Sequence, residues 1–264
     1  MTPHYGEAVA DLIEGVGLVD LWGRMGWADV RRRYRRTVFG PFWSSFSLAI
    51  FVGTMGFVWA TLWKIDPKEY LPYLTSGMLT WLLLTSFITE GCQVFVAAES
   101  LIKQLRINYT MLLCAMVWRN LITFAHNIVV YIPVYIYSGL PLTANVLMVV
   151  PGVIFLCLNG IWIALVLGIL CTRFRDVQQV VNSLLQVLIF VTPIFWSPAQ
   201  LTGIKTVLVD YNMLYHYVEI VRDPLLGQAP SPRSWVMVIL ATLIGWGLAI
   251  FLFSRFRRRI AYWV

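Results

Sequence analysis

The sequence predicts an all-α integral membrane protein with six transmembrane helices, and three observations support this fold class. Hydrophobic residues make up 59% of the 264 residues and charged residues only 12%, whereas about a quarter of a soluble domain is charged. Long apolar runs recur along the chain, each close to the roughly 20 residues that a helix needs to cross the hydrocarbon core. Fifteen of the twenty Lys and Arg residues fall in alternate segments between these runs. The spans are expected at about 42–63, 71–97, 118–138, 146–171, 177–196 and 235–254.

The distribution of basic residues predicts the orientation and the partners. By the positive-inside rule, both termini and the basic connections are cytoplasmic. The formal net charge of +7 comes from residues near span ends, so anionic lipid headgroups are the expected partner. No nucleic-acid partner is expected, because no soluble domain is large enough to present a binding face. One integral domain over residues 1–264 is predicted.

The N-terminal arm is predicted to carry a helix that lies on the membrane over residues 18–41. The arm does not resemble a cleavable signal peptide, since the first long apolar run starts only at Phe42. Trp27, Val30, Tyr34 and Val38 recur at spacings of three and four and form an apolar stripe. The helix either anchors the chain at headgroup level or uses its arginines to receive an anionic headgroup, because a planar guanidinium binds phosphate oxygens in pairs. The arginines expected in the second role are Arg31, Arg32, Arg33, Arg35 and Arg36.

Two cytoplasmic connections are candidates for partner contacts. Glu99–Thr110 is expected to form a short helix with an apolar face, which is either a docking knob for a cytosolic protein or an interfacial loop without a partner. The pattern alone favours the loop. Arg173–Asp176 forms a tighter turn, in which Asp176 is placed to pair with either arginine; such an exposed pair adds little stability.

The fifth connection, residues 197–233, lies outside and is too apolar for an ordinary loop. Short re-entrant helices are expected there, since such segments are tolerated in a membrane only when packed against protein or a watery cavity. The segment is either an outer gate or a passive lid.

Catalytic, metal and cofactor sites are not expected in this chain. A P-loop needs Gly-Lys followed by Ser or Thr, and none of the four lysines follows a glycine. A Gly-x-Ser-x-Gly nucleophile motif is missing as well. The four cysteines and three histidines make no zinc pattern, and the cysteines are expected to pack as small apolar residues.

Polar residues inside the spans are few. Glu90 lies towards the cytoplasmic half of the second span, where exposure of a carboxylate to lipid is costly. It either hydrogen-bonds between helices, with Arg119 as the candidate partner, or transfers protons; the scarcity of other carboxylates favours the hydrogen bond. The intramembrane polar residues singled out are Glu90, Arg119, His126 and Asn127.

The 12 Trp and 12 Tyr residues exceed what the two interface belts require. Aromatic rings with a polar edge are suited to line a path for sugars, although interface anchoring explains many of them. The expected channel or gate residues are Tyr131, Tyr135, Tyr137, Phe195, Trp196, Tyr215 and Tyr217.

Six stretches of sequence resemble one family. They are Tyr34–Trp43 (YRRTVFGPFW), Leu101–Gln104 (LIKQ), Trp118–Asn127 (WRNLITFAHN), Arg173–Asp176 (RFRD), Thr192–Pro198 (TPIFWSP) and Tyr215–Gly227 (YHYVEIVRDPLLG). The chain resembles the membrane subunits of type-two ABC exporters, most closely the Wzm-like permeases for O-antigen polysaccharide. It departs from them at Asn212-Met213, where relatives have Asn-Pro, and at Ile107–Thr110, where relatives often carry a proline.

The resemblance implies a homodimer in the bacterial inner membrane joined to two cytosolic P-loop (Wzt-like) ATPase subunits, which bind ATP and Mg. The cargo would be polysaccharide on undecaprenyl diphosphate, and this subunit would perform no covalent chemistry. The residues implied to couple to the ATPase are Glu99, Lys103, Gln104, Arg106, Arg173, Arg175 and Asp176.

Three alternatives remain at this stage. Another type-two exporter would move teichoic acid, a small lipid or a drug. A lipid-linked-sugar enzyme should carry catalytic residues in a large outer loop, and the ionisable residues of 197–233 form no known catalytic arrangement. A proton-driven carrier should have more intramembrane carboxylates.

Overall fold

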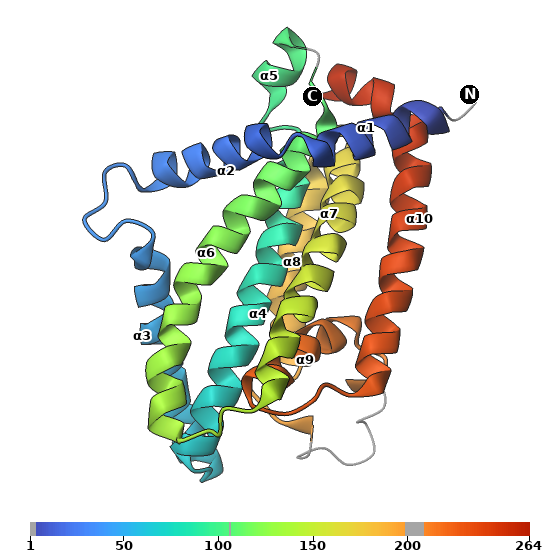
Figure 1. Ribbon diagram of the computed structural model, residues 1–264. Coiled ribbons are helices and arrows are strands. Elements are labelled where there is room, and N and C mark those ends of the chain that lie inside the picture. Colours follow the sequence, from blue (N-terminus) through green and yellow to red (C-terminus); the bar gives the residue numbers. More distant parts are fainter. Residues whose placement is uncertain (1–3, 106, 199–208) are drawn as a thin grey trace.

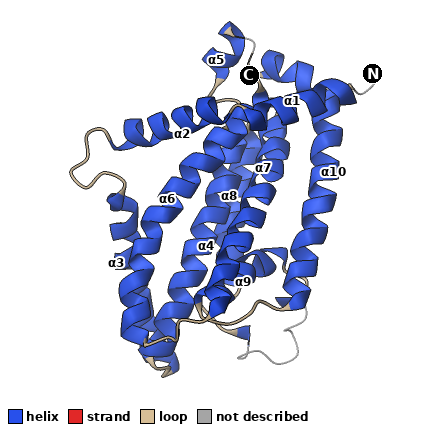
Figure 2. Cartoon of the chain, viewed as in Figure 1, coloured by secondary structure: helices blue, strands red, loops and turns tan. Residues whose placement is uncertain are grey.

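The computed structural model describes residues 4–105, 107–198 and 209–264, and within these ranges all regular structure is helical (Figure 2). Both chain ends lie at the same end of the bundle, which we call the terminal end (Figure 1). Helix α5, Glu99–Gln104, projects beyond the terminal end, and α9, Met213–Leu225, lies at the opposite end.

Five helical segments are long and apolar enough to cross a membrane. They are α3 (Phe42–Trp63), α4 (Pro67–Gln93), α6 (Tyr109–Ser138), η1 with α7 (Ala144–Met148 and Val149–Arg173), and α10 (Pro232–Trp263). A sixth, α8 (Asp176–Val191), is apolar but has only 16 residues. The chain is therefore a multi-pass membrane protein.

Helix α4 is the centre of the packing, with α6 and α7 against it. Small residues let the backbones approach closely, as is usual where helices pack in a membrane. A Cβ atom on Gly91 would lie 2.7 Å from Ala164 Cα, and one on Gly160 would lie 2.6 Å from the Phe87 ring. These two contacts fix α7 against α4.

Two helices lie across the terminal end (Figure 1). The first, α1 (Tyr5–Gly17), was not anticipated from the sequence. The second, α2 (Val19–Tyr34), ends before the predicted boundary at residue 41. Val38 lies beyond the helix, so its predicted place in the apolar stripe is wrong; of the other stripe residues, Val30 is buried against the bundle and Trp27 is half exposed. Close packing on α6 selects the buried face, since a Cβ on Gly26 would lie 2.8 Å from the Ala115 carbonyl oxygen.

The short helix predicted within Glu99–Thr110 is present as α5, but it ends at Gln104 rather than Thr110, and α6 already begins at Tyr109. The side chain of Asn108 caps α6 by accepting a hydrogen bond from Thr110 N at 3.1 Å, a common way to satisfy the first free amides of a helix. Arg119, which the sequence placed at a span boundary, is therefore well inside α6.

Other boundaries moved for local reasons. Helix α8 stops at Val191 rather than 196, because Thr192 precedes Pro193 and adopts an extended conformation. Helix α10 continues to Trp263, so the basic residues after 254 are helical rather than a tail. Of the predicted re-entrant segment, residues 199–208 lie outside the described residues.

Candidate functional site

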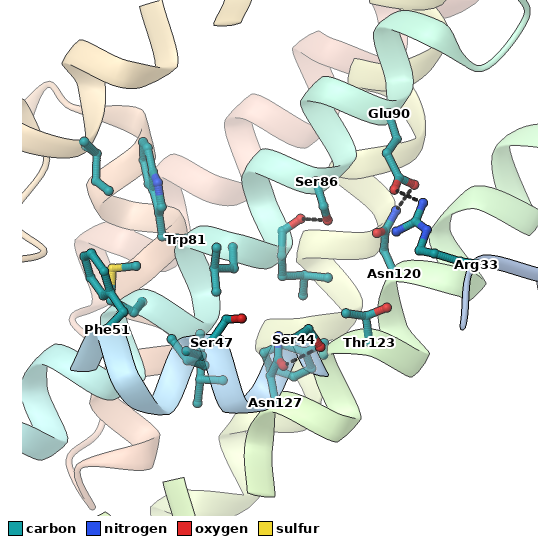
Figure 3. Close-up of a pocket in the computed structure, with 17 residues that line it drawn as sticks. Arg33, Ser44, Ser47, Phe51, Trp81, Ser86, Glu90, Asn120, Thr123 and Asn127 are labelled. Carbon is teal, nitrogen blue, oxygen red and sulfur yellow. Dashed lines mark hydrogen bonds and ion pairs between the residues drawn. The ribbon is translucent and has the colours of Figure 1, made fainter. Parts of the chain in front are cut away.

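A cavity of about 530 Å³ lies between α3, α4 and α6 (Figure 3). Its polar and charged lining residues are Arg33, Ser44, Ser47, Ser86, Glu90, Asn120, Thr123 and Asn127. Its apolar lining residues are Leu48, Phe51, Met78, Leu79, Trp81, Leu82, Leu83, Phe124 and Ile189.

Helical spacing explains how these residues come to share one space. On α4, Met78, Leu82, Ser86 and Glu90 recur every fourth residue and so occupy one face. On α6, Asn120, Thr123 and Asn127 are spaced by three and four residues and likewise share one face. Arg33, Glu90 and Asn120 gather at one end of the cavity, and Phe51 and Trp81 lie at the other (Figure 3). The cavity thus has a charged end and an apolar, aromatic end.

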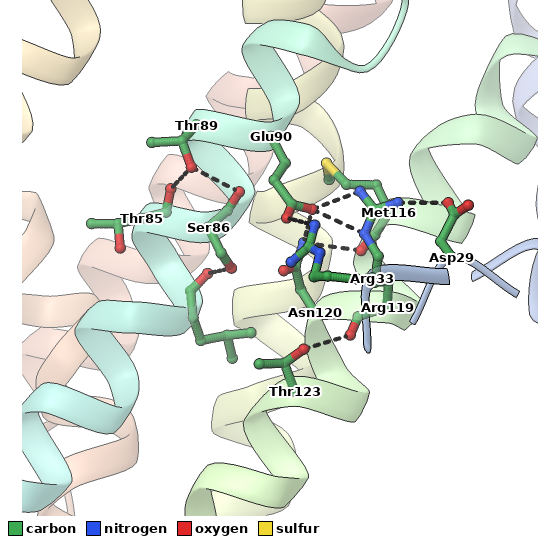
Figure 4. A network of polar contacts seen from close by, with 11 residues as sticks. Asp29, Arg33, Thr85, Ser86, Thr89, Glu90, Met116, Arg119, Asn120 and Thr123 are labelled. Atoms are coloured by element: carbon green, nitrogen blue, oxygen red, sulfur yellow. Dashed lines mark hydrogen bonds and ion pairs between the residues drawn. The ribbon is translucent and has the colours of Figure 1, made fainter. Parts of the chain in front are cut away.

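A network of hydrogen bonds and ion pairs lies at the charged end of the cavity (Figure 4). Glu90 Oε1 accepts a hydrogen bond from Arg33 Nη2 at 2.9 Å. Glu90 Oε2 accepts from Arg119 Nη2 at 2.6 Å and from Asn120 Nδ2 at 2.8 Å. The hydrogen bond between Glu90 and Arg119 that the sequence favoured is therefore present.

Arg119 extends the network to α2. Its Nη1 donates to Asp29 Oδ2 at 2.7 Å, so one guanidinium joins α2, α4 and α6. Burial acts to lower the pKa of Arg33, but the hydrogen bond and charge of Glu90 outweigh it, so that the pKa is raised and the side chain stays charged.

The structure separates the five arginines of the predicted headgroup site. Arg33 lines the cavity, whereas Arg32 points to Asp29 at 3.7 Å with 80% of its side chain exposed. Within the described ranges, none of the other three forms an ion pair; these are Arg31, Arg35 and Arg36.

Of the two remaining polar residues singled out from the sequence, Asn127 ties α3 to α6. Asn127 Oδ1 accepts hydrogen bonds from the hydroxyls of Ser44 and Ser45, both at 3.1 Å. His126 Nδ1 lies 2.7 Å from its own helix at Ile122 O. These contacts position the polar wall of the cavity.

The predicted channel tyrosines mostly use their hydroxyls inside the fold. Tyr131 donates to Leu225 O at 2.7 Å, Tyr217 to Asn159 Oδ1 at 2.7 Å, and Tyr215 to Glu219 Oε1 at 2.8 Å. Tyr135 is partly buried beside Tyr131, with ring centroids 6.1 Å apart, and Tyr137 is half exposed. Their predicted role as path-lining residues stays a prediction.

Phe195 and Trp196 belong to a turn whose carbonyl groups are held by other elements. Tyr70 donates to Phe195 O at 2.8 Å. Tyr73 donates to Trp196 O at 3.0 Å. Arg222 Nη1 donates to Pro193 O at 2.6 Å. These contacts fix the C-terminal end of α8 to α4 and α9.

Arg222 is the residue of this cluster that sequence reasoning did not single out. It is only 2% exposed, and its guanidinium lies 4.3 Å from the centre of the Tyr73 ring. A basic residue inside an apolar stretch was the available signal, because a buried charge needs partners.

Replacing Arg222 with Gln is expected to lower the free energy of unfolding by about 2 kcal/mol, the loss typical of a hydrogen bond made by a charged group. Tyr73→Phe keeps the ring and removes only the hydroxyl, so we expect a loss of about 1 kcal/mol. Equilibrium unfolding in mixed SDS micelles measures both. Equal stability of Arg222→Gln and the parent protein would refute the anchoring role of Arg222.

The predicted coupling residues lie at the terminal end. Lys103 Nζ is 2.6 Å from Glu99 Oε1 within α5, and this hydrogen bond holds the pKa of Glu99 below its ordinary value. Gln104 is the last residue of α5, and Arg106 lies outside the described residues. Arg173 lies over the rings of Phe174 and Trp263 at 5.2 and 5.1 Å. In the described chain, neither Arg173 nor Arg175 forms an ion pair with Asp176, so the anticipated pairing is wrong.

Comparison with known proteins identifies the family. The sequence model of the ABC-2 type transporter family matches residues 21–226, which run from α2 to just beyond α9. Two Klebsiella pneumoniae proteins described as O-antigen export system permease protein RfbA are similar to the chain. One is 22% identical over 228 residues, covering 84% of this chain and 87% of its own length. The other is 21% identical over 200 residues, covering 74% and 76%. Together with the multi-pass helical fold, the match shows that the chain belongs to the ABC-2 type transporter family, as its resemblance to type-two permeases indicated.

Proposed function

We propose that the chain is the membrane subunit of an ATP-driven exporter that moves lipid-linked cell-surface polysaccharide, of the O-antigen kind, across the bacterial inner membrane. In this arrangement α8 is a sixth crossing: its 16 residues extend about 24 Å at 1.5 Å per residue, and the turn after it continues towards the outer surface. Both termini and α5 are cytoplasmic, and the Lys and Arg distribution supports this orientation. The working unit is a homodimer with two P-loop ATPase subunits.

The observation that carries the proposal is the cavity between α3, α4 and α6. Its charged end supplies a guanidinium for an anionic group, and its wall supplies hydroxyl and amide groups that can hydrogen-bond with sugar hydroxyls. Its far end is apolar and aromatic. A lipid-linked glycan combines these three chemistries. The similarity to two O-antigen export permeases supports the same cargo class.

The ATPase is proposed to act through α5, which projects from the terminal end (Figure 1). Lys103→Glu reverses a half-exposed charge and breaks the pair with Glu99. We expect export to fall about tenfold, the equivalent of 1.4 kcal/mol in coupling, while ATP hydrolysis by the complex persists. Surface polymer and ATPase activity are measured in parallel.

The charge-swapped variant Glu99→Lys with Lys103→Glu is the matched control for that experiment, because it keeps the ion pair within α5. If docking depends on the charge pattern presented to the partner, the swap also fails. Full export by the Lys103→Glu variant would show that the ATPase contacts a segment other than α5.

Deletion of the gene tests the proposed cargo. Polymer should disappear from the cell surface and accumulate inside the cell on its lipid carrier, and the intact gene should restore it. Normal surface polymer in the deletion strain would reject polysaccharide as the cargo and leave teichoic acid, a small lipid or a drug.

A further inference from the structure

The charge network at the cavity is built around the carboxylates of Asp29 and Glu90, and the two arginines that contact Glu90 are not equivalent. Arg119 has 17% of its side chain exposed and contacts both Asp29 and Glu90. Arg33 has 48% of its side chain exposed and, within the described residues, forms one ion pair, to Glu90. Arg33 also lines the cavity. Of the two, Arg33 is the one that a ligand can reach.

If Arg33 moved away, the negative charge of Glu90 would still be compensated by Arg119. Glu90 Oε2 would still accept hydrogen bonds from three donor atoms, which are Nε and Nη2 of Arg119 and Nδ2 of Asn120. The freed oxygen, Oε1, belongs to a residue that lines the cavity, so water can replace the lost hydrogen bond. The large penalty for orphaning a buried charge is therefore avoided. The network holds a fixed pair, Glu90 with Arg119, and an exchangeable partner, Arg33.

We propose that Arg33 is the exchangeable anion receptor of the cavity: a phosphate-bearing amphiphile takes it from Glu90, and Glu90 sets the affinity by competing for the same guanidinium. This inference rests on the proposed function and specifies which arginine acts and what opposes it. Phosphate oxygens bind a guanidinium in the same paired geometry as a carboxylate, so one anion can replace the other.

The exchange has a structural consequence. The Arg33–Glu90 pair links the last turn of α2 to α4, whereas the Asp29–Arg119 pair holds α2 on α6. When Arg33 leaves, the end of α2 is released from α4 while the body of the helix stays in place. Glu90 lies three residues before the end of α4, and α5 begins at Glu99. Binding of the amphiphile thereby changes the contacts of α4 close to α5, the segment proposed to contact the ATPase.

Binding of farnesyl diphosphate to the purified full-length protein in nanodiscs of neutral lipid tests the exchange. Glu90→Gln removes the competing charge and is expected to tighten binding about tenfold, the effect of one charge-assisted hydrogen bond. Arg33→Gln is expected to weaken it about tenfold, and the double variant should bind as Arg33→Gln does. Arg24→Gln, an exposed arginine earlier on α2, is the matched control and should leave the dissociation constant unchanged.

Several results would overturn the exchange. One is unchanged binding in Glu90→Gln, and another is an equal loss in Arg32→Gln and Arg33→Gln, which would indicate diffuse attraction. If inorganic pyrophosphate bound as tightly as farnesyl diphosphate, the apolar chain would contribute nothing and the ligand of the site would be a free anion rather than an amphiphile. Equally tight binding of phosphatidylglycerol would assign the site to the phospholipids of the bilayer and would contradict the role of Arg33 in receiving a lipid-linked cargo.

Thermal unfolding of each variant is compared first. If Glu90→Gln does not fold, Arg33→Lys provides the second test, because it keeps the charge, loses the paired geometry and should bind between parent and Arg33→Gln. The assay uses neither ATPase nor polymer. Failure of export in the deletion experiment and failure of exchange are therefore separate results.

Discussion

Replacing Arg119 with Ala is expected to lower the free energy of unfolding by about 3 kcal/mol, because it removes the shared partner of two carboxylates. Glu90 would keep Arg33 and Asn120, which holds the loss at the lower end of the range for a broken buried ion pair. Among the described residues, Asp29 would keep only the ion pair with Arg32, at 3.7 Å. The α2–α6 contact should therefore weaken most.

Equilibrium unfolding in mixed micelles of increasing SDS fraction measures this loss, and limited proteolysis of the N-terminal arm locates it. Arg32→Ala is the matched control on the exposed side of the same network and should cost less than 1 kcal/mol. Equal effects of the two substitutions would show that the network does not hold α2 on α6.

Replacing Asp11 with Ala is expected to have a comparable effect at the other side of the terminal end, again about 3 kcal/mol. Asp11 is 2% exposed. It accepts hydrogen bonds from Thr110 N at 3.1 Å, from Thr110 Oγ1 at 2.9 Å, and from Arg257 Nη2 at 2.7 Å. One carboxylate thus joins α1, the start of α6 and the end of α10.

Asp11→Asn keeps an acceptor for the Thr110 amide and should lose only part of the stability. Glu7→Ala is the control on the same helix, since Glu7 pairs with Arg258 at the surface and such pairs contribute little. Loss of stability in Glu7→Ala equal to that in Asp11→Ala would contradict a specific role for the buried carboxylate.

Apolar runs were enough to place five helices long enough to span a membrane, but the ends of these helices depend on contacts that a single segment does not reveal. The start of α6 is set by Asn108 within the chain and by Asp11 from a distant helix. Helix α1 carries acidic residues that interrupt its apolar pattern; its buried face is Ala8, Asp11 and Gly15, and Asp11 is satisfied only in the folded state. Local periodicity therefore missed it.

For the site too, part was predictable from the sequence and part depends on contacts between distant segments. The sequence identified Glu90 with Arg119 as partners because an intramembrane carboxylate needs compensation. It also identified the arginine run on the interfacial helix, but it gave the five arginines equal weight. Only the packing of α2 on α6 distinguishes Arg33, which reaches Glu90, from Arg32, which stays outside. Arg222 was missed because its hydrogen-bond acceptor is the backbone carbonyl group of Pro193, 29 residues earlier in the chain.

ATP-dependent movement of a lipid-linked glycan in inverted inner-membrane vesicles tests the central claim most directly. Vesicles containing the chain and its ATPase are supplied with labelled lipid-linked polymer on their cytoplasmic face and then treated with a glycosidase that cannot enter. We predict that ATP makes the label resistant to the enzyme in these vesicles and not in vesicles from the deletion strain. Label that stays equally sensitive with and without ATP, while the complex hydrolyses ATP, would contradict export of this cargo by the chain.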